Sequence, residues 1–276
     1  MHRKIKILVI GNCQARPVAK LLAKNSSQID ALQPIITHLS RPEMEIEHLK
    51  QFNHADFILA QLTQDTFSVP HLRSKYIKEQ FPNKTFIWPN IFSASQQPFL
   101  RYVTHRLKKI RIQGPLEAYH DLRILSSWYE NHGQKQLKLP VEDSVHRTSL
   151  EQLQDRERFC DVKVSDLIAT NLDRKRLFFT FNHPTLWLLV KMLERLVDLT
   201  PFKVEFNNLQ SNEPLGRIIA PSIFDNCDDA IYQGPMIQLK SKVEIHSGPA
   251  VQYNYERLRN TFFEAYTNQG ELLFDF

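Results

Sequence analysis

The N-terminal third of the chain alternates short apolar runs with longer amphipathic stretches, and this alternation restricts the fold more than any other feature. The apolar runs have the length and composition of buried strands and occupy residues 4–10, 32–36, 56–61 and 85–88. Helical spacing of apolar residues occurs between them, at residues 15–24, 44–52 and 71–80. Strands that alternate with helices pair in parallel. We therefore predict an α/β fold with a parallel sheet.

The pattern changes after residue 98 and returns to a strand followed by a helix near residue 177. Residues 98–171 are charged and helix-like, with long helices expected at residues 116–130 and 149–169, which indicates a helical insertion or cap. Residues 177–181 read as a strand, residues 184–199 as an amphipathic helix and residues 253–266 as a closing helix, with turn-rich chain at 201–248. We predict a single α/β domain over residues 1–276, with residues 98–171 as an insertion within it.

Composition places the chain among ordinary globular proteins. Hydrophobic residues make up 42% of the 276 residues, and the longest aliphatic stretch, residues 186–190, is far shorter than the about 20 residues that span a bilayer. The apolar run at residues 7–10 is too short for a secretory signal. Three widely spaced cysteines, Cys13, Cys160 and Cys227, fit reduced thiols better than a disulfide framework. We expect a cytoplasmic protein without a transmembrane segment.

The charge balance favours an anionic ligand. Lysine and arginine number 35 against 30 acidic residues, which gives a net charge of +5. The sequence has no zinc-finger spacing or RNA-binding aromatic motif, so we expect no nucleic-acid partner. No histidine stands at ligand spacing from Cys227, and we expect no metal site. The densest basic stretch is interpreted as a phosphate cradle or as a solvated helix face, and includes Arg101, Arg106, Lys108 and Lys109.

A Gly-Asn-Cys-Gln motif at residues 11–14 connects the first predicted strand to the first predicted helix. Open α/β sheets bind ligands at the carboxyl ends of their strands, and a thiol at a helix N-terminus has a lowered pKa. Cys13 is therefore placed to be a nucleophile. The alternative is that Cys13 is a small buried hydrophobe, and its position alone does not separate the two. Gly11 lacks the further glycines of a dinucleotide-binding motif.

A second motif, Phe-Asn-His-Pro at residues 181–184, follows the late strand. Pro184 suits the first position of a helix, which makes His183 the expected cap residue. Two strand ends of one parallel sheet open on the same edge, so we expect Cys13 and His183 to meet. The helix N-terminus would keep His183 neutral and able to act as a base. A lone histidine is more often structural, and its pairing with Cys13 is what favours catalysis.

Two further amide side chains follow predicted strands. Gln61 ends the third strand and Asn90 follows the fourth. At these positions they are candidates to donate hydrogen bonds to an oxyanion, together with the backbone N–H of Cys13. Local turn capping is the alternative role.

The Gly-Asn-Cys-Gln motif, Gln61, Trp-Pro-Asn at residues 88–90 and Phe-Asn-His-Pro together resemble the WcbI family. These capsular-polysaccharide biosynthesis proteins are regarded as acetyltransferases that bind coenzyme A on a fold similar to SGNH hydrolases. The resemblance implies a three-layer SGNH-hydrolase-like core, with Cys13 in the place of the nucleophile and His183 in that of the base. It also implies substrate or oxyanion contacts within the motifs, at Asn12, Gln14 and Asn182.

One residue departs from the hydrolase pattern. Thr180 stands where an aspartate three residues before the histidine would orient it. A thiolate needs less help from such an acid than a serine does, so a Cys-His pair remains chemically sufficient.

These observations predict transfer of an acyl group, acetyl by preference, from coenzyme A to a saccharide hydroxyl in capsular or surface polysaccharide biosynthesis. His183 would deprotonate either Cys13, for a covalent acyl-enzyme, or the sugar hydroxyl directly. Two alternatives remain open: an esterase or thioesterase that uses water as acceptor, and a non-catalytic module that binds a nucleotide or glycan.

Overall fold

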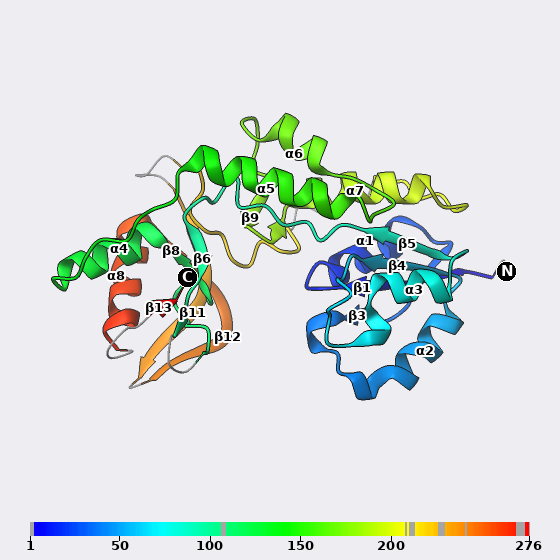
Figure 1. Cartoon of the computed structure of the whole chain (residues 1–276), viewed down its shortest axis with the longest axis horizontal. Coiled ribbons are helices and arrows are strands. Elements are labelled where there is room, and N and C mark those ends of the chain that lie inside the picture. The colour runs from blue at the N-terminus through cyan, green and yellow to red at the C-terminus, as the bar shows by residue number, and fades with distance from the viewer. Residues whose placement is uncertain are drawn as a thin grey trace. The chain divides into compact units, whose positions relative to one another are not determined.

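The computed structural model describes residues 3–105, 109–207, 209, 213–225, 230–240, 242–268 and 274–275, with only the backbone described at 236–240, 242–248 and 274–275. Contacts divide the chain into two compact units (Figure 1). Unit 1 comprises Met1–Ile91, Leu150–Asn171 and Thr185–Pro214. Unit 2 comprises Phe92–Ser149, Leu172–Pro184 and Leu215–Phe276. The predicted single domain stays a prediction.

Unit 1 is built on a five-stranded parallel sheet of order β2-β1-β4-β5, with β3 also beside β1. Its strands are β1 (Ile5–Gly11), β2 (Ile29–Ala31), β3 (Ile35–Ile36), β4 (Phe57–Gln61) and β5 (Thr85–Trp88). Val9 pairs with Leu59, and Gln61 pairs with Trp88. The carboxyl ends of β1, β4 and β5 therefore share one edge, and the predicted parallel sheet is confirmed.

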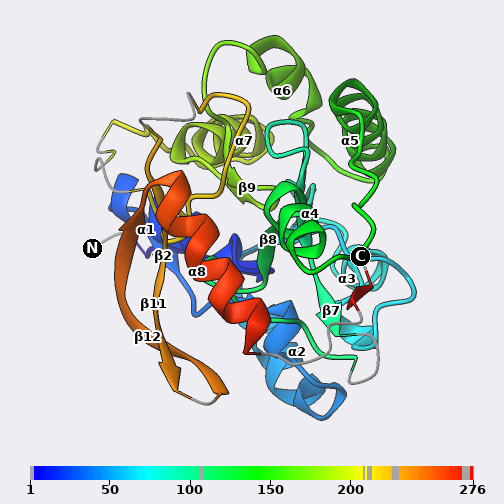
Figure 2. The ribbon, with the colours of Figure 1, turned by 90° about the vertical axis from the view of Figure 1, so that its left-hand side faces the viewer.

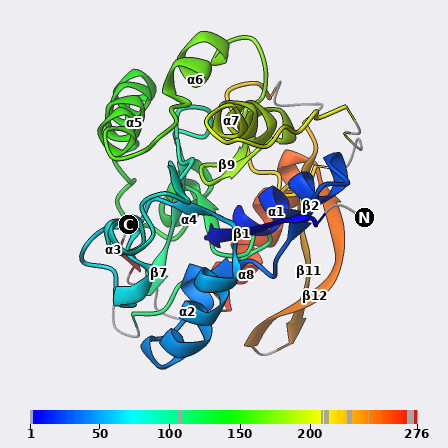
Figure 3. The same ribbon diagram turned by 90° about the vertical axis from the view of Figure 1, so that its right-hand side faces the viewer.

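Helices cover both faces of this sheet. Leu8 and Ile10 of β1 pack with Phe52 of α2 (Glu45–His54) and Ile77 of α3 (Ser74–Gln80). Successive strand residues point to opposite faces, so Val9 faces the other way, where it is fully buried. On that side α1 (Ala15–Asn25) contacts α7 (Leu186–Asp198), which also contacts β5. Figure 3 shows β1 between α2 and α7. The resulting α/β core has the three layers that the family resemblance implies.

Short 3-10 helices complete unit 1 and lie at η1 (Thr37–Leu39), η2 (Pro42–Met44) and η3 (Pro70–Leu72). The sequence predicts one helix over residues 149–169, and this prediction is wrong. The structure has α5 (Glu142–Glu157) and α6 (Ser165–Asn171), separated by a turn. The buried carboxylate of Glu157 accepts hydrogen bonds from the N–H groups of Val164 and Ser165 at the start of α6. These bonds satisfy N–H groups at the start of α6 that lack partners within the helix, and they tie the end of α5 to α6.

Unit 2 combines antiparallel strand pairs with helices. The pairs join β6 (Leu100–Tyr102) to β8 (Tyr119–Asp121), β7 (Thr104–His105) to β13 (Phe274–Asp275), β9 (Phe178–Thr180) to β10 (His183–Pro184) and β11 (Tyr232–Lys240) to β12 (Lys242–Tyr253). Helix α8 (Tyr255–Thr267) packs against α4 (Leu122–Asn131) and the β11–β12 hairpin (Figure 2). Phe262 and Tyr266 of α8 are buried in the aromatic core of this unit.

Three sequence expectations for unit 2 are corrected. Residues 98–171 are not wholly helical, since they contain β6, β7 and β8. Residues 201–248 are not wholly irregular, since they contain most of a long hairpin. Gly234 and Pro235 hide its strand character, because both residue types are depleted in strands. Gly234 is required there: a Cβ would lie 1.9 Å from the carbonyl oxygen of Pro115. The strand predicted at 177–181 pairs antiparallel with β10 and does not join the parallel sheet.

Buried histidines make the stability of the fold depend on pH. The His120 ring lies within 2.8 Å of the Tyr266 hydroxyl and 3.1 Å of the Ile112 carbonyl oxygen, and burial lowers its pKa to about 4. His48 Nδ1 lies 2.8 Å from His71 Nε2, and burial likewise lowers the pKa of both rings. Each ring is neutral in the folded chain, so unfolding takes up protons once the pH falls below the ordinary value of 6.5.

We therefore expect the free energy of unfolding to be unaffected by these histidines above pH 6.5 and to fall as the pH drops from 6.5 toward 4. The slope for His120 alone is at most about 1.4 kcal/mol per pH unit. Urea unfolding at a series of pH values measures it, and His120→Phe should flatten the curve in this window. Equal stability of the wild type at pH 7 and pH 5 would contradict the expectation.

Candidate functional site

The Gly-Asn-Cys-Gln motif forms the turn from β1 to α1 at the carboxyl edge of the unit 1 sheet. Helix α1 begins at Ala15, and Gln14 is its N-cap residue. A Cβ at Gly11 would lie 3.0 Å from Oε1 of Gln61 and 3.1 Å from the Trp88 ring. Glycine is therefore needed here, because side chains from β4 and β5 close directly over the turn.

A chain of buried amides braces this turn. The N–H of Asn12 donates to Gln61 Oε1 at 2.8 Å, and Gln61 Nε2 donates to Gln14 Oε1 at 2.9 Å. Gln14 Nε2 donates in turn to the carbonyl oxygen of Ile91 at 2.8 Å. Gln14 and Gln61 are almost fully buried, and buried amides are stable only when they are paired. Both glutamines therefore hold the turn in one conformation.

The side chain of Asn12 connects the thiol to Asn90. Asn12 Oδ1 accepts the N–H of Gln14 at 2.9 Å and lies 3.9 Å from Cys13 Sγ. Asn12 Nδ2 donates to Asn90 Oδ1 at 3.2 Å. Within the described residues the structure gives Asn90 Nδ2 no partner, so this group is available to donate to a ligand. Unit 1 thus brings together Cys13 and four of the five amide residues that the sequence singles out.

Burial reverses the expectation for the thiol pKa. Burial raises the pKa of Cys13 above its ordinary value, and the backbone N–H groups of Cys13 and Gln14 oppose this only in part. The N–H groups at the helix start favour the thiolate, as the sequence predicts, but the desolvation of the thiolate outweighs them. The resting side chain is a thiol, and a base has to remove its proton before it can act as a nucleophile.

His183 lies in unit 2, in β10 opposite Thr180. The N-cap of α7 is Thr185, so the predicted capping position of His183 is wrong. Burial, rather than a helix N-terminus, lowers the pKa of His183 to about 4 and keeps the ring neutral. Its Nδ1 is buried without a partner among the described residues. Because β9 is outside the parallel sheet, the shared-edge argument for a Cys13–His183 pair fails, and the pair stays a prediction.

Asn182 organises a hydroxyl cluster in unit 2 that the sequence did not reveal. Its Oδ1 accepts from the hydroxyls of Tyr119 at 2.7 Å and Thr180 at 3.0 Å, and its Nδ2 donates to Tyr102 Oη at 3.2 Å. The Tyr119 ring also packs on His183, with centroids 5.7 Å apart. Tyr119 stands in a stretch that reads as helix, and no motif marks it.

The described residues of the basic stretch do not lie in a helix. Arg101 in β6 is half-buried and donates to its neighbour's carbonyl oxygen at 2.7 Å. Lys109 is exposed, with a φ of 52°. The Arg111 guanidinium stacks 3.8 Å from the Tyr102 ring centre. Arg106 and Lys108 lie outside the described residues, and the phosphate cradle stays a prediction.

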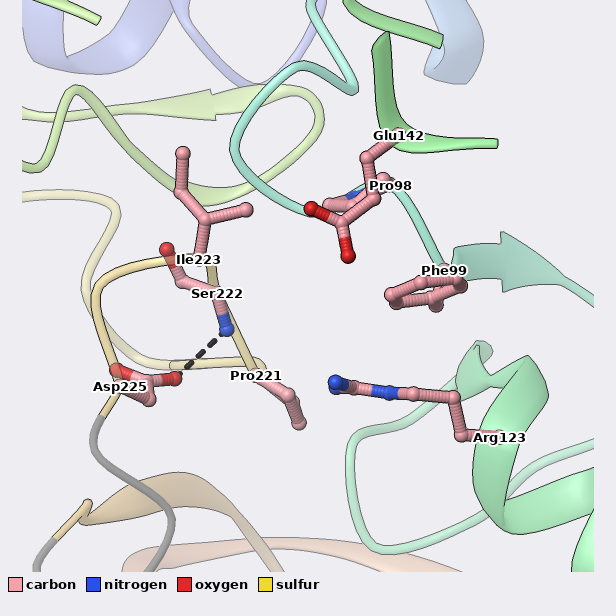
Figure 4. Close-up of a pocket in the computed structure, with 8 residues that line it drawn as sticks. All are labelled: Pro98, Phe99, Arg123, Glu142, Pro221, Ser222, Ile223 and Asp225. Carbon is pink, nitrogen blue, oxygen red and sulfur yellow. Dashed lines mark hydrogen bonds between the residues drawn. The ribbon is translucent and has the colours of Figure 1, made fainter. Parts of the chain in front are cut away.

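A small cavity in unit 2 has a volume of about 210 Å³ (Figure 4). Arg123 points into it between Phe99 and Pro221, while Asp225 accepts from the backbone N–H of Ser222 at 2.7 Å. The guanidinium is already paired, since Arg123 Nη2 and Nε donate to the Asp121 carboxylate at 2.6 and 3.3 Å. This cavity is below the usual size of a ligand pocket.

The residues that the structure describes contain no cluster of three or more histidine, cysteine or acidic side chains suited to a metal ion. None of their helices combines the length and apolarity needed to cross a bilayer.

The burial of Cys13 predicts its alkylation behaviour. In the ligand-free protein, iodoacetamide should modify Cys13 with a pH midpoint above that of a free cysteine, about 8.5. Cys160 is the internal control, because burial raises its pKa further, to about 12, and it should react more slowly at each pH. Peptide mass spectrometry of samples alkylated between pH 6 and 10 measures both sites. A Cys13 midpoint well below 8.5 would show that the backbone N–H groups outweigh burial.

Comparisons with known proteins agree with this architecture. A solved structure of WcbI, described as a novel polysaccharide biosynthesis enzyme, is 17% identical to this chain with a TM-score of 0.67. The match covers 96% of this chain and 90% of the other. That protein is further described as native and without a disulfide bond between coenzyme A and one of its cysteines. No curated protein matches the chain.

The family comparison is more direct. The family model of the polysaccharide biosynthesis enzyme WcbI matches residues 6–203, which is well over half of the chain. The matched segment contains both the Gly-Asn-Cys-Gln and the Phe-Asn-His-Pro motifs. The chain therefore belongs to the WcbI family of polysaccharide biosynthesis enzymes.

Proposed function

We propose that this protein transfers an acyl group, acetyl by preference, from coenzyme A to a saccharide hydroxyl, and that Cys13 lies at the reacting centre. The observation that carries the proposal is the braced β1–α1 turn, in which buried amides hold a half-buried thiol beside Asn12, whose side chain in turn donates to Asn90. A purely structural cysteine needs no such support.

The comparison structure supports coenzyme A as the ligand to test. That structure is described with reference to coenzyme A and one of its cysteines. In the present chain the Gly-Asn-Cys-Gln turn holds a thiol at the sheet edge where α/β folds bind ligands. The net charge of +5 suits a donor that carries phosphates. Arg101 and Lys109 are the described members of the basic stretch proposed to bind them.

In the covalent route, the Cys13 thiol loses its proton to a base and attacks the thioester carbonyl. The bond between the acetyl carbon and the coenzyme A sulfur breaks, coenzyme A leaves as a thiol, and acetyl-Cys13 forms. A saccharide hydroxyl then attacks this second thioester, gives up its proton to the base and releases Cys13. We propose His183 as the base, because burial keeps its ring neutral at physiological pH.

In the direct route, the saccharide hydroxyl attacks acetyl-coenzyme A itself and no acyl-enzyme forms. Both routes pass through a tetrahedral oxyanion. We propose that Asn90 Nδ2 donates to it, since this is the amide of the braced turn without a protein partner. Gln61 and Gln14, whose amides bind the turn, act by positioning Asn12 and Cys13.

Coenzyme A should bind the isolated protein with micromolar-class affinity. Because phosphate charge supplies part of the attraction, the affinity should fall as salt is added. Isothermal calorimetry with coenzyme A at low and high ionic strength measures both effects. If millimolar coenzyme A produces neither binding heat nor a shift in the melting temperature, the assignment of coenzyme A as the acyl donor is wrong.

The two routes differ in the behaviour of Cys13 variants. On the covalent route, incubation with acetyl-coenzyme A without an acceptor should add one acetyl group to Cys13, as intact-mass spectrometry detects. Cys13→Ala should abolish this adduct, while Cys160→Ala should keep it. Asn90→Ala should slow acetylation on the order of 100- to 1,000-fold and leave coenzyme A affinity unchanged. Asn53→Ala, at an exposed position of α2, is the matched control. A fully active Cys13→Ala enzyme would exclude the covalent route and leave only the direct route.

A further inference from the structure

Unit 1 contains an open groove with a volume of about 1230 Å³. Three segments form its walls: the loop after β4 at residues 62–68, one side of α3, and the end of α5 with the turn that follows, at residues 155–161. Asn90 lines the same groove. The name "unit 1 groove" refers to this surface.

Aromatic rings stand in the unit 1 groove among polar side chains. Phe159 lines it and is 73% exposed, although it follows the charged end of α5. Phe67 is a second ring in the lining. A single exposed apolar residue is ordinary, but an exposed Phe159 ring and the partly exposed ring of Phe67 in one groove offer apolar surface to a ligand. The C–H face of a sugar ring is apolar in the same way, while its edge carries hydroxyls.

The charges of the groove disfavour a phosphate ligand. Four carboxylates line it, from Asp65, Glu79, Asp155 and Asp161, against three cations, Lys75, Lys78 and Arg156. Ion pairs remove charges of both signs, since Lys78 lies 3.3 Å from the Asp161 carboxylate and Arg158 lies 3.1 Å from that of Asp155. The lining therefore has no excess of positive charge to attract the phosphates of coenzyme A. Carboxylates accept hydrogen bonds from hydroxyls, so the lining suits an uncharged, polyhydroxylated ligand.

The groove adjoins the braced turn through Asn90. Its Oδ1 accepts from Asn12 Nδ2, and Asn12 precedes Cys13. The loop that forms one wall is anchored at its start, because Thr63 and Ser74 exchange hydrogen bonds. An anchored wall lowers the entropy cost of binding.

We propose that the unit 1 groove binds the saccharide acceptor, with an uncharged sugar ring stacked on Phe159 and its hydroxyls bonded to the carboxylates and to Asn90. This assignment rests on the proposed transfer to a saccharide and adds the site and the chemical class of the acceptor. An acceptor hydroxyl at the Asn90 end reaches the part of unit 1 that holds Cys13.

The test uses an array of neutral and acidic bacterial oligosaccharides as probes for the full chain. Wild type should retain neutral saccharides, and Phe159→Ala should weaken retention about tenfold, while Phe159→Trp should keep it. Ile46→Ala is the matched control, because Ile46 is 71% exposed on α2 and outside the groove lining. Calorimetry should show the same coenzyme A affinity for all four proteins.

The outcomes separate this assignment from the proposed function. Loss of coenzyme A affinity in Phe159→Ala with saccharide retention unchanged would overturn it and make the groove a donor site. Retention of acidic saccharides alone, or of none, would overturn it as well. If Phe159 controls retention but the wild type transfers no acetyl group to the retained saccharide, the groove assignment stands and acyl transfer is wrong. If transfer occurs and Phe159→Ala leaves the acceptor KM unchanged, transfer stands and the groove assignment is wrong.

Discussion

The hydrogen bond from the Asn12 N–H to Gln61 Oε1 is the contact on which the rest of the site depends. It joins the end of β4 to the turn after β1, and the other end of the same amide holds Gln14. The ladder between β1 and β4 ends at Ile10 and Ala60, so the buried side-chain amide continues the connection between these two strands beyond their last paired residues. Gly11 makes this contact possible, because any side chain there would push Gln61 and Trp88 away.

The chemical character of the site follows from burial more than from dipoles. Burial raises the pKa of the Cys13 thiol in unit 1 and, separately, lowers that of the His183 imidazole in unit 2, so both groups are uncharged in the resting protein. A neutral thiol resists oxidation and non-specific alkylation better than a thiolate does. Ionisation of Cys13 therefore requires a base or a change in the surroundings of the thiol.

The sequence predicted the parallel sheet well, because β1, β4 and β5 are continuous apolar runs with helices between them. It also predicted Cys13, Asn12, Gln61 and Asn90 as neighbours, since parallel strands end at one edge. Prediction from the sequence failed for features of the structure that depend on packing between distant residues. The α5–α6 break depends on one buried carboxylate, the hairpin strands contain glycine and proline, and Tyr119 belongs to no motif. The solvent exposure of a side chain cannot be read from a motif, so the sequence predicted a lowered pKa for Cys13 where burial raises it.

The buried carboxylate of Glu157 has a consequence for selectivity. It lies within the segment that forms one wall of the unit 1 groove, and it ties that segment to the start of α6. Any displacement of this wall away from α6 would break the hydrogen bonds of a buried carboxylate, which is costly. The width of the groove, and with it the range of acceptors proposed to bind there, therefore depends on the α5–α6 turn as well as on the residues that line the groove.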